Sequence, residues 1–505
     1  MRATSADTPD GDDVEHLGKG SVVVPSEMSD KGVKVRSGRI ELRLGGALDP
    51  IAWLGPGSAL GDLRPLLEAG IPVTAVVVSE RAELVPLAGA APDDPTLRVG
   101  TSRRTSIAPR VTAVFGAALT ELASLLERSG NEVRLARLPG APQLPGMSEE
   151  ELTGERLLGA LEEPWPAPPG RGAPHLLLAL PEIPTGDALR AVERAHVVLA
   201  EARAPRWLST RGTGRPVLRM RAGEGVPPRV VRFAEGRAVG LALSGGGSKA
   251  VAHIGVIAVL REHGIEIDAV AGTSGGALVG AAVAFHRTCD RMMGMVRELA
   301  SATRLRRFDY HLVPRSAIFK GVRLRSLFES WYPGEAFTDS EIPFWAVASD
   351  LLTGEEVVID TGPISDGLRA SMSLPGILDP WPLDGRRLLD GVAVNPLPAS
   401  VLRAAGAGVV IGSDVASGVG APGSSESPHL LRMVSRMMHS MEREMIKSQL
   451  GLIDVLVATR MRAVHSFDFS RAEEFAAHGA AEARERLPDL LRVLGGDAGG
   501  LSPAP

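Results

Sequence analysis

The amino-acid sequence predicts an α/β protein with a smaller all-β part ahead of it. Strand-like apolar runs alternate with helical stretches over residues 238–415, which is typical of an α/β layer structure. A shorter version of the same alternation occupies residues 111–221. Before it, residues 15–88 contain short apolar or alternating runs separated by glycine and proline, a pattern that predicts short antiparallel strands.

The domain boundaries follow from changes in composition along the chain. A chain of 505 residues exceeds one ordinary core, so we expect about two to four domains. The remaining segments are a disordered tail over 1–14, a polar linker over 89–110 and a helical part over 416–495. Within the last segment we expect one long helix from about 429 to 464 and another from about 470 to 494.

Charge and cysteine content exclude several classes of protein. The formal net charge of -5 argues against a nucleic-acid partner. The single cysteine, Cys289, excludes an intrachain disulfide and fits a reducing compartment. Residues 1–14 are acidic and lack the apolar stretch of a signal peptide. We therefore expect a cytoplasmic protein whose contact with membranes, where it occurs, is peripheral.

The glycine run Gly245–Gly247 is the first candidate site. The stretch GGGSKA, between a predicted strand and a predicted helix, satisfies the loose dinucleotide pattern G-x-G-x-x-[GA]. Glu266 and Asp268 follow at about the distance expected of a ribose-binding acid. The run does not match the phosphate-binding P-loop. A tight strand-to-helix turn without any ligand explains it as well.

The next predicted strand ends in GTSGG, residues 272–276. This is the G-x-S-x-G nucleophile elbow, in which a serine occupies a sharp turn between a strand and a helix. The pattern makes Ser274 the candidate nucleophile, and Gly272 and Gly276 leave room for the strained backbone. Acyl transfer at a serine creates an oxyanion, and backbone amides of a glycine-rich loop can stabilise it. A hydride-transfer site would not need the second motif, so the pair favours an oxyanion over a nucleotide phosphate.

A nucleophilic serine needs a proton acceptor. The order Ser…Asp…His would allow Ser274 and Asp390 with His439, His465 or His478. None of these histidines stands in a glycine-rich loop after a strand, so Asp390 in RRLLDGVAVNPLP is the better candidate base. An ordinary Asp-Gly turn between two strands is the competing interpretation.

Five stretches follow one another along the second half of the chain: SGGGSKAVAHIGV, GTSGG, SDLLTGEEVVI, SMSLPGILDP and LLDGVAVNPLP. In this order they resemble the motifs of patatin-like phospholipases, and the neuropathy target esterase branch is the most similar. The resemblance covers roughly residues 238–415. It implies a three-layer hydrolase domain with a central, mostly parallel sheet, which hydrolyses phospholipid or lysophospholipid acyl esters without a cofactor or metal.

The resemblance also implies roles for particular residues. Ser274 and Asp390 would form a catalytic dyad without histidine. The backbone amides of Gly245, Gly246 and Gly247 would form the oxyanion hole together with Lys249. The chain departs from the family where Lys249-Ala250 replaces the usual Arg-Gly, and where Val392 stands in place of a glycine or alanine after Asp-Gly.

The same branch carries cyclic-nucleotide-binding domains ahead of its hydrolase domain, and residues 15–88 resemble one such β-roll. The positions that would contact the ribose and the cyclic phosphate read Gly61-Asp62 and Pro72-Val73-Thr74. Val73 cannot pair with a phosphate. We therefore expect a degenerate module that does not bind a cyclic nucleotide.

Two other functions stay open at this stage. A regulatory or scaffold protein could retain the fold with weak or no catalysis, since the β-roll and the catalytic loops depart from the family pattern. A dinucleotide-binding enzyme could use the glycine run instead. Labelling of Ser274 by a fluorophosphonate distinguishes a hydrolase from a regulatory or scaffold protein. Saturable binding of a nicotinamide cofactor would favour the dinucleotide-binding enzyme.

Overall fold

The computed structural model divides the chain into two compact units, residues 1–108 with 164–167, and the remainder. In the first unit it describes residues 15–18, 22–23, 33–37, 40–44, 52–54, 59–60, 73–77 and 81–86. In the second it describes residues 110–116, 118–143, 151–162, 174–201, 204–205, 207–208, 215–220, 225–302, 309–311, 316–416, 430–461 and 469–495.

The N-terminal unit consists of short strands in two sheets. One sheet has the order β1-β8-β3-β6 and the other β2-β7-β4-β5, and all the pairings are antiparallel. Gly61, Asp62 and Pro72, on which the prediction of a lost cyclic-nucleotide site partly rests, lie outside the described residues. The strands are β1 Glu15–Gly18, β2 Val22–Val23, β3 Val33–Ser37, β4 Ile40–Leu44, β5 Ala52–Leu54, β6 Ala59–Leu60, β7 Val73–Val77 and β8 Arg81–Pro86.

The second unit begins with a five-stranded parallel sheet of order β10-β11-β9-β12-β13. Its core is built from strands without polar alternation, such as HLLLA and VVLAE, as expected of a sheet covered on both faces. Its strands are β9 Arg110–Phe115, β10 Val133–Arg137, β11 His175–Ala179, β12 Val197–Glu201 and β13 Leu218–Met220. The helices that accompany them are α2 Ala118–Arg128, α3 Gly154–Glu162, α4 Gly186–Arg194 and α6 Pro228–Glu235.

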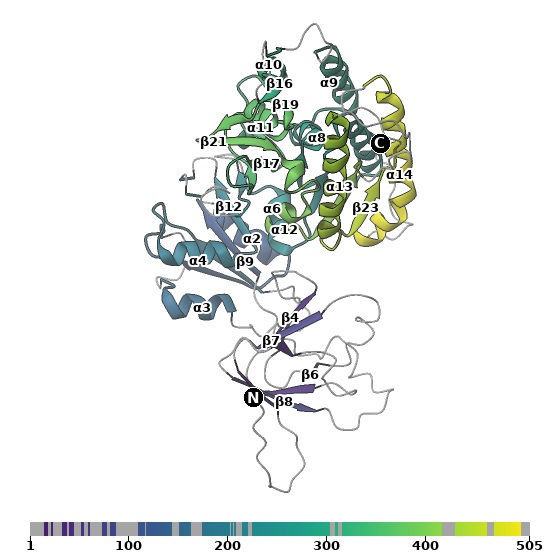
Figure 1. The fold of residues 1–505 in the computed structure, drawn as a ribbon. Helices are drawn as coiled ribbons and strands as arrows, with labels where there is room; N and C mark the ends of the chain where they lie inside the picture. Colours follow the sequence, from purple (N-terminus) through teal and green to yellow (C-terminus); the bar gives the residue numbers. More distant parts are fainter. Residues whose placement is uncertain are drawn as a thin grey trace. The chain divides into compact units, whose positions relative to one another are not determined.

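The rest of the second unit surrounds an eight-stranded sheet (Figure 1). The order is β20-β21-β17-β15-β14-β22-β23, and β18 pairs with β17. Five neighbouring strands pair in parallel, in the order β17, β15, β14, β22 and β23. The strands β18, β20 and β21 add antiparallel pairs on the β17 side of the sheet. This confirms the predicted α/β class with a mostly parallel central sheet. The strands are β14 Val239–Leu243, β15 Ala269–Thr273, β17 Phe344–Asp350, β18 Glu356–Ile359, β20 Trp381–Leu383, β21 Arg386–Asp390, β22 Val409–Asp414 and β23 Val455–Ala458.

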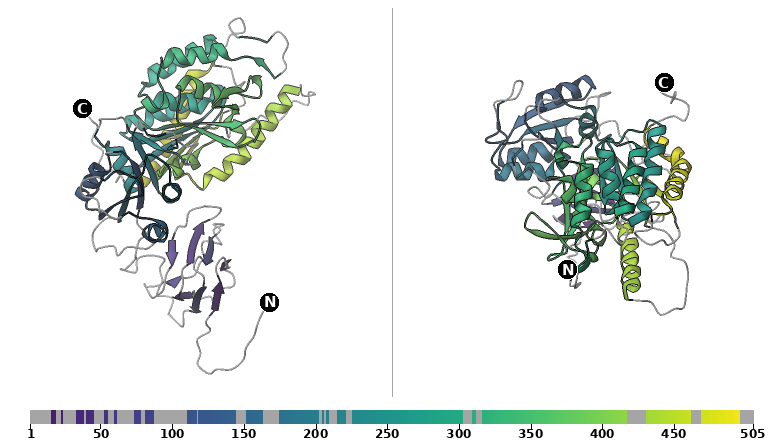
Figure 2. Two further views of the ribbon diagram at one scale, coloured as in Figure 1. Left: turned by 90° about the vertical axis from the view of Figure 1, so that its left-hand side faces the viewer. Right: turned by 90° about the horizontal axis from the view of Figure 1, so that it is seen from above.

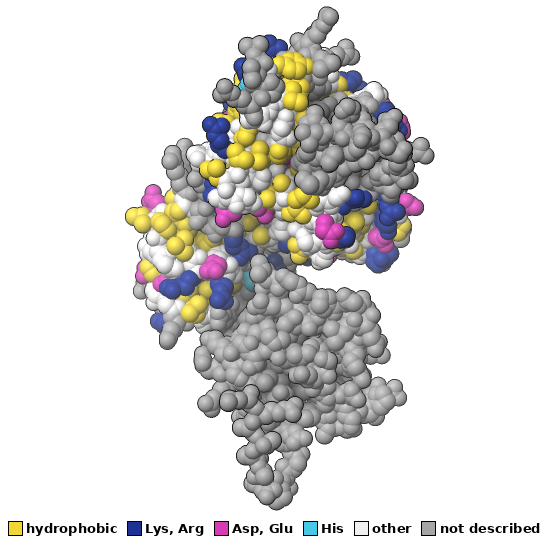
Figure 3. Space-filling view, in the orientation of Figure 1, with side chains coloured by type: hydrophobic (Ala, Val, Ile, Leu, Met, Phe, Trp, Pro, Cys, Tyr) yellow, Lys and Arg dark blue, Asp and Glu magenta, His cyan; other side chains and the backbone are white. Residues whose placement is uncertain are grey.

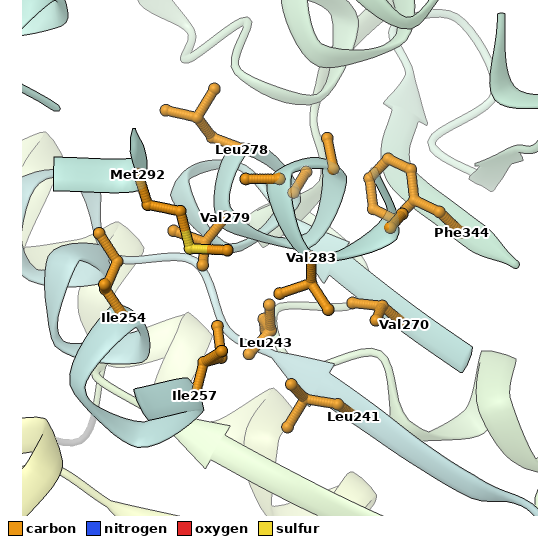
Figure 4. Close-up of a cluster of buried hydrophobic side chains, with 14 of the residues drawn as sticks. Leu241, Leu243, Ile254, Ile257, Val270, Leu278, Val279, Val283, Met292 and Phe344 are labelled. Carbon is orange, nitrogen blue, oxygen red and sulfur yellow. The ribbon is translucent and has the colours of Figure 1, made fainter. Parts of the chain in front are cut away.

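Helices cover both faces of this sheet (Figure 2). Successive side chains of a strand point to opposite faces, so Leu241 and Leu243 join one apolar cluster while Ala242 joins the other. Figure 4 shows part of the first cluster, where Ile254 and Val283 pack toward the sheet. The helices on that side are α7 Ala252–Glu262, α8 Gly275–Ala284, α9 Cys289–Ala302, α10 Val322–Trp331, α11 Ile364–Ser371 and α14 Ala472–Val493.

The second face is covered by α6, α12 (Ala399–Ala404) and α13 (Leu430–Leu450). The expected helix over 429–464 is wrong in its second half, because α13 ends at Leu450 and Val455–Ala458 forms strand β23. The apolar, β-branched run VLVA pairs in parallel with β22 at the edge of the sheet, and that pairing overrides the helical pattern before it. The last helix, α14, lies close to its expected position.

On the face shown in Figure 3, charged side chains of both signs are interspersed over the described residues. Among the described residues, no helix combines the length and the apolar character that crossing a bilayer requires.

Candidate functional site

Ser274 lies at the turn between β15 and α8. Its backbone φ is 54° and its ψ is −121°, a conformation that non-glycine residues rarely adopt and that is typically found at functional sites. The flanking glycines allow this turn, since a β-carbon on Gly276 would lie 2.3 Å from the carbonyl oxygen of Leu243. A β-carbon on Gly272 would lie 2.5 Å from the carbonyl oxygen of Gly276. Only glycine fits at either position.

Asp390 ends β21, which pairs with β17, the neighbour of the strand that carries Ser274. The Ser274 Oγ donates a hydrogen bond of 2.7 Å to Asp390 Oδ2. The other carboxylate oxygen, Oδ1, accepts the Val392 N–H at 3.0 Å. The structure therefore brings together the two residues that the sequence proposed as nucleophile and base.

Burial sets the protonation of this pair. Asp390 is 2% exposed, and desolvation raises the pKa of its carboxyl to about 7. The hydrogen bonds from Ser274 and Val392 act in the opposite direction and lower this pKa. The carboxylate of Glu442, on α13, repels a negative charge at Asp390 and raises this pKa further. A base whose pKa is near neutral can both accept and return a proton at physiological pH.

The glycine loop approaches the elbow from the neighbouring strand β14. Gly247 has a φ of 58° and begins the 3₁₀ helix η3 (Gly247–Val251). A β-carbon on Gly275 would lie 3.0 Å from the carbonyl oxygen of Gly247, so the two backbones are in contact. The Gly245 N–H donates to the carbonyl oxygen of Pro396 at 3.0 Å. The Gly245 amide is thus already hydrogen-bonded, and so is the amide of Lys249, which donates to the carbonyl oxygen of Gly246 at 3.2 Å. Of the predicted oxyanion donors, the amides of Gly246 and Gly247 stay candidates.

The two departures from the family pattern both contact this loop. A β-carbon on Gly245 would lie 2.5 Å from Val392 Cγ1, so the valine packs directly against the glycine. Lys249 is 8% exposed. Burial lowers the pKa of its ammonium, whereas the carboxylates of Glu442 and Asp414 oppose that shift. The Lys249 side chain is thus buried two residues beyond the last glycine of the loop.

Two buried side chains that no sequence motif indicates form hydrogen bonds around the site. Ser371, at the end of α11, accepts the Ser274 N–H at 2.9 Å. His253 accepts the Ser413 hydroxyl at Nδ1 (2.7 Å) and donates from Nε2 to the Ser244 carbonyl oxygen (3.0 Å). A carbonyl only accepts, so Nε2 carries a proton. Burial lowers the His253 pKa to about 4, so the ring is neutral near pH 7 and its Nδ1 accepts. Both lie in quoted stretches, SMSLPGILDP and SGGGSKAVAHIGV, but no spacing rule gives either a role.

Within the part of the chain that the structure describes, no histidine proposed as an alternative base lies at the elbow. His478 is exposed on α14. His465 and the side chain of His439 lie outside the described residues. Asp390 is therefore the acceptor that the structure places on Ser274.

An apolar pocket opens beside the elbow. Its lining includes Gly247 of the glycine loop and Gly275, the residue after the nucleophile. The other residues around it are Ala250, Val251, Leu278, Val279, Val296, Leu299, Leu324, Met372 and Phe469. A pocket without a polar side chain next to a nucleophile suits a hydrocarbon chain.

Comparison with known proteins shows what this region is similar to. Residues 241–403 match the sequence model of the patatin family, described as patatin-like phospholipase. These residues therefore have the sequence pattern of a patatin-like domain. The matched range of the patatin-like domain includes the glycine loop, Ser274, Ser371 and Asp390.

Two relatives are about one third identical to this chain over roughly 200 residues. A patatin-like phospholipase domain-containing protein of Caenorhabditis elegans is 37% identical over 195 residues, which are 37% of this chain and 14% of that protein. An uncharacterised NTE family protein of Mycobacterium tuberculosis is 33% identical over 211 residues, 42% of this chain and 58% of that protein. The chain thus spans between 14% and 58% of the length of these two relatives.

The crystal structure of VipD from Legionella pneumophila is similar over 51% of this chain and 66% of its own, at 12% identity and a TM-score of 0.28.

Proposed function

We propose that this protein is a serine hydrolase that cleaves acyl esters of phospholipids or lysophospholipids through a Ser274–Asp390 dyad and a covalent acyl-enzyme. The observation that carries the proposal is the 2.7 Å hydrogen bond from the Ser274 hydroxyl to a buried carboxylate. The strained elbow and the apolar pocket support it.

In the first step, Ser274 Oγ attacks the acyl carbonyl carbon while its proton passes to Asp390 Oδ2. The oxyanion that forms is held by the amides of Gly246 and Gly247 at the N-terminus of η3. When the carbonyl re-forms, the bond to the leaving alcohol breaks and the alcohol takes the proton from Asp390. The products are the acyl-serine and the released alcohol.

In the second step, water attacks the acyl carbonyl and gives a proton to the same carboxylate. Collapse of the second tetrahedral intermediate breaks the bond to Ser274, which regains the proton, and releases the fatty acid. The acyl chain lies in the apolar pocket during both steps, and so lipid esters suit the site better than polar esters.

A fluorophosphonate probe tests this proposal on the full-length protein. Wild-type protein should be labelled at Ser274, and it should release fatty acid from phosphatidylcholine or lysophosphatidylcholine in vesicles or micelles. Ser274→Ala should abolish labelling, and Asp390→Asn should slow it by two or more orders of magnitude, since the general base contributes about 10²–10⁴-fold. Folded wild-type protein that fails to label would overturn the proposal and support a scaffold role.

For residues 15–88 we propose a cyclic-nucleotide-binding-like β-roll that has lost its phosphate contact. The antiparallel pairing of its short strands supports this proposal, and so does the valine at position 73. Titration with cyclic AMP should give no saturable binding, and saturable binding would refute it.

A further inference from the structure

The end of helix α11 contacts the backbone of both members of the proposed dyad. Ser371 is the last residue of α11, and its side chain is fully buried. Its Oγ accepts the backbone N–H of Ser274 at 2.9 Å. Two residues later, the carbonyl oxygen of Ser373 accepts the backbone N–H of Asp390 at 3.0 Å.

The Ser371 hydroxyl is oriented by a third strand. It donates its proton to the carbonyl oxygen of Val347 at 2.6 Å. Because that proton is engaged, the lone pairs of Oγ face the Ser274 N–H. Val347 belongs to β17, which lies between the strand of Ser274 and the strand of Asp390. One hydroxyl therefore links the elbow to the strand that also positions the base.

The elbow needs such an acceptor. At a φ of 54°, Ser274 stands outside both the strand before it and the helix after it. A buried N–H without an acceptor is strongly unfavourable. Removal of the Ser371 hydroxyl leaves this N–H without its partner, and the strained turn can then relax. Any such movement displaces the Ser274 Oγ from Asp390 and from the oxyanion amides.

We propose that Ser371 is a positioning residue that holds the nucleophile elbow in its strained conformation and thereby aligns the Ser274 hydroxyl with Asp390. The inference rests on the proposed hydrolase function and deepens it. Ser371 is not among the residues that line the pocket, and its hydrogen bond to the elbow goes to the backbone N–H of Ser274, so we expect it to act on the rate of acylation and not on substrate binding. A displacement of about 1 Å at a reacting group can lower the rate on the order of 10²-fold.

A matched pair of variants separates positioning from ordinary stabilisation. Ser365 lies on the same helix, is equally buried, and its hydroxyl donates to Glu329 Oε2 at 2.6 Å, away from the dyad. Ser371→Ala and Ser365→Ala each delete one buried hydroxyl from α11. The measurements are the fluorophosphonate labelling rate of Ser274 per folded molecule, kcat and KM on a soluble short-chain ester, and the melting temperature.

We expect Ser371→Ala to lower kcat and the labelling rate on the order of 10²-fold with little change in KM, and Ser365→Ala to alter only the melting temperature. Ser371→Cys is close in size to serine but a weaker acceptor, so it should fold and fall between wild type and Ser371→Ala. If Ser371→Ala does not fold, Ser371→Cys decides the question on the same measurements.

The outcomes distinguish the two proposals. Wild-type protein that does not label at Ser274 refutes the hydrolase function itself. Wild-type protein that labels, with Ser371 variants whose kcat matches that of Ser365→Ala, refutes the positioning role and leaves the hydrolase intact.

Discussion

Replacing Asp390 by asparagine should stabilise the protein at alkaline pH while it removes the proposed catalytic base. The carboxyl is 2% exposed, and burial raises its pKa from the ordinary 3.8 to about 7. A folded-state pKa above the unfolded value means that ionisation opposes folding. Asparagine keeps the shape and does not ionise, so this opposition disappears.

The magnitude follows from the pKa shift. Below pH 3.8 the carboxyl is protonated in both the folded and the unfolded chain, and pH has no effect through this group. Between 3.8 and about 7 the unfolded chain has released the proton and the folded chain has not, so stability falls as pH rises. The loss is complete above about pH 7 and amounts to roughly 4 kcal/mol at 1.36 kcal/mol per unit.

The assay is thermal or urea unfolding of the full-length protein and of Asp390→Asn, from about pH 5 to pH 8. The difference in stability should grow in favour of the variant as pH rises, by several degrees in melting temperature for a gain of a few kcal/mol. Glu444→Gln removes a carboxylate that is 72% exposed and should show no such trend. A difference between Asp390→Asn and wild type that does not vary with pH would refute a buried carboxyl with a raised pKa.

Three further predictions follow from the same contacts. Glu442→Gln removes a negative charge that raises the pKa of Asp390. The acid limb of the pH profile of kcat/KM should therefore move to lower pH, and an acid limb that stays in place would contradict this. Gly276→Ala places a methyl group 2.3 Å from a backbone oxygen and should lower the melting temperature sharply or prevent folding, whereas Gly451→Ala, with open space around it, should not. Leu299→Phe narrows the apolar pocket and should reduce hydrolysis of long-chain esters relative to short-chain esters by roughly tenfold, which corresponds to about 1.4 kcal/mol of lost apolar contact. An unchanged ratio of the two kcat/KM values would show that the acyl chain lies elsewhere.

Short motifs predicted the positions that depend on local backbone geometry. The spacing G-x-S-x-G pointed to Ser274, and the structure gives that serine a positive φ and leaves no room for a β-carbon at either flanking glycine. The same spacing could not predict Ser371. A hydroxyl that accepts from an amide 97 positions away leaves no periodic or compositional signal.

The prediction of three oxyanion donors shows the same limit. Glycines in sequence indicate that the backbone approaches something closely, but not which amide does so. The Gly245 N–H is taken by the carbonyl oxygen of Pro396, which arrives from a loop about 150 residues later. The prediction of a helix over 429–464 failed in its second half for a similar reason. The run VLVA forms a strand because it pairs with β22, and nothing within the run itself indicates that partner.

Most of the helices and strands, the α/β class with a mostly parallel sheet, and the residue types at the elbow could be predicted from the sequence, because these depend on neighbours a few positions apart. Which groups meet, and in what protonation state, follows only from the packing of the folded chain. It placed Ser274 within 2.7 Å of an aspartate 116 positions away, and it excluded water from that aspartate so that its pKa rises to about 7. The physical reason is that hydrogen bonds across a sheet and desolvation depend on groups from many elements at once, and no short stretch of sequence contains them.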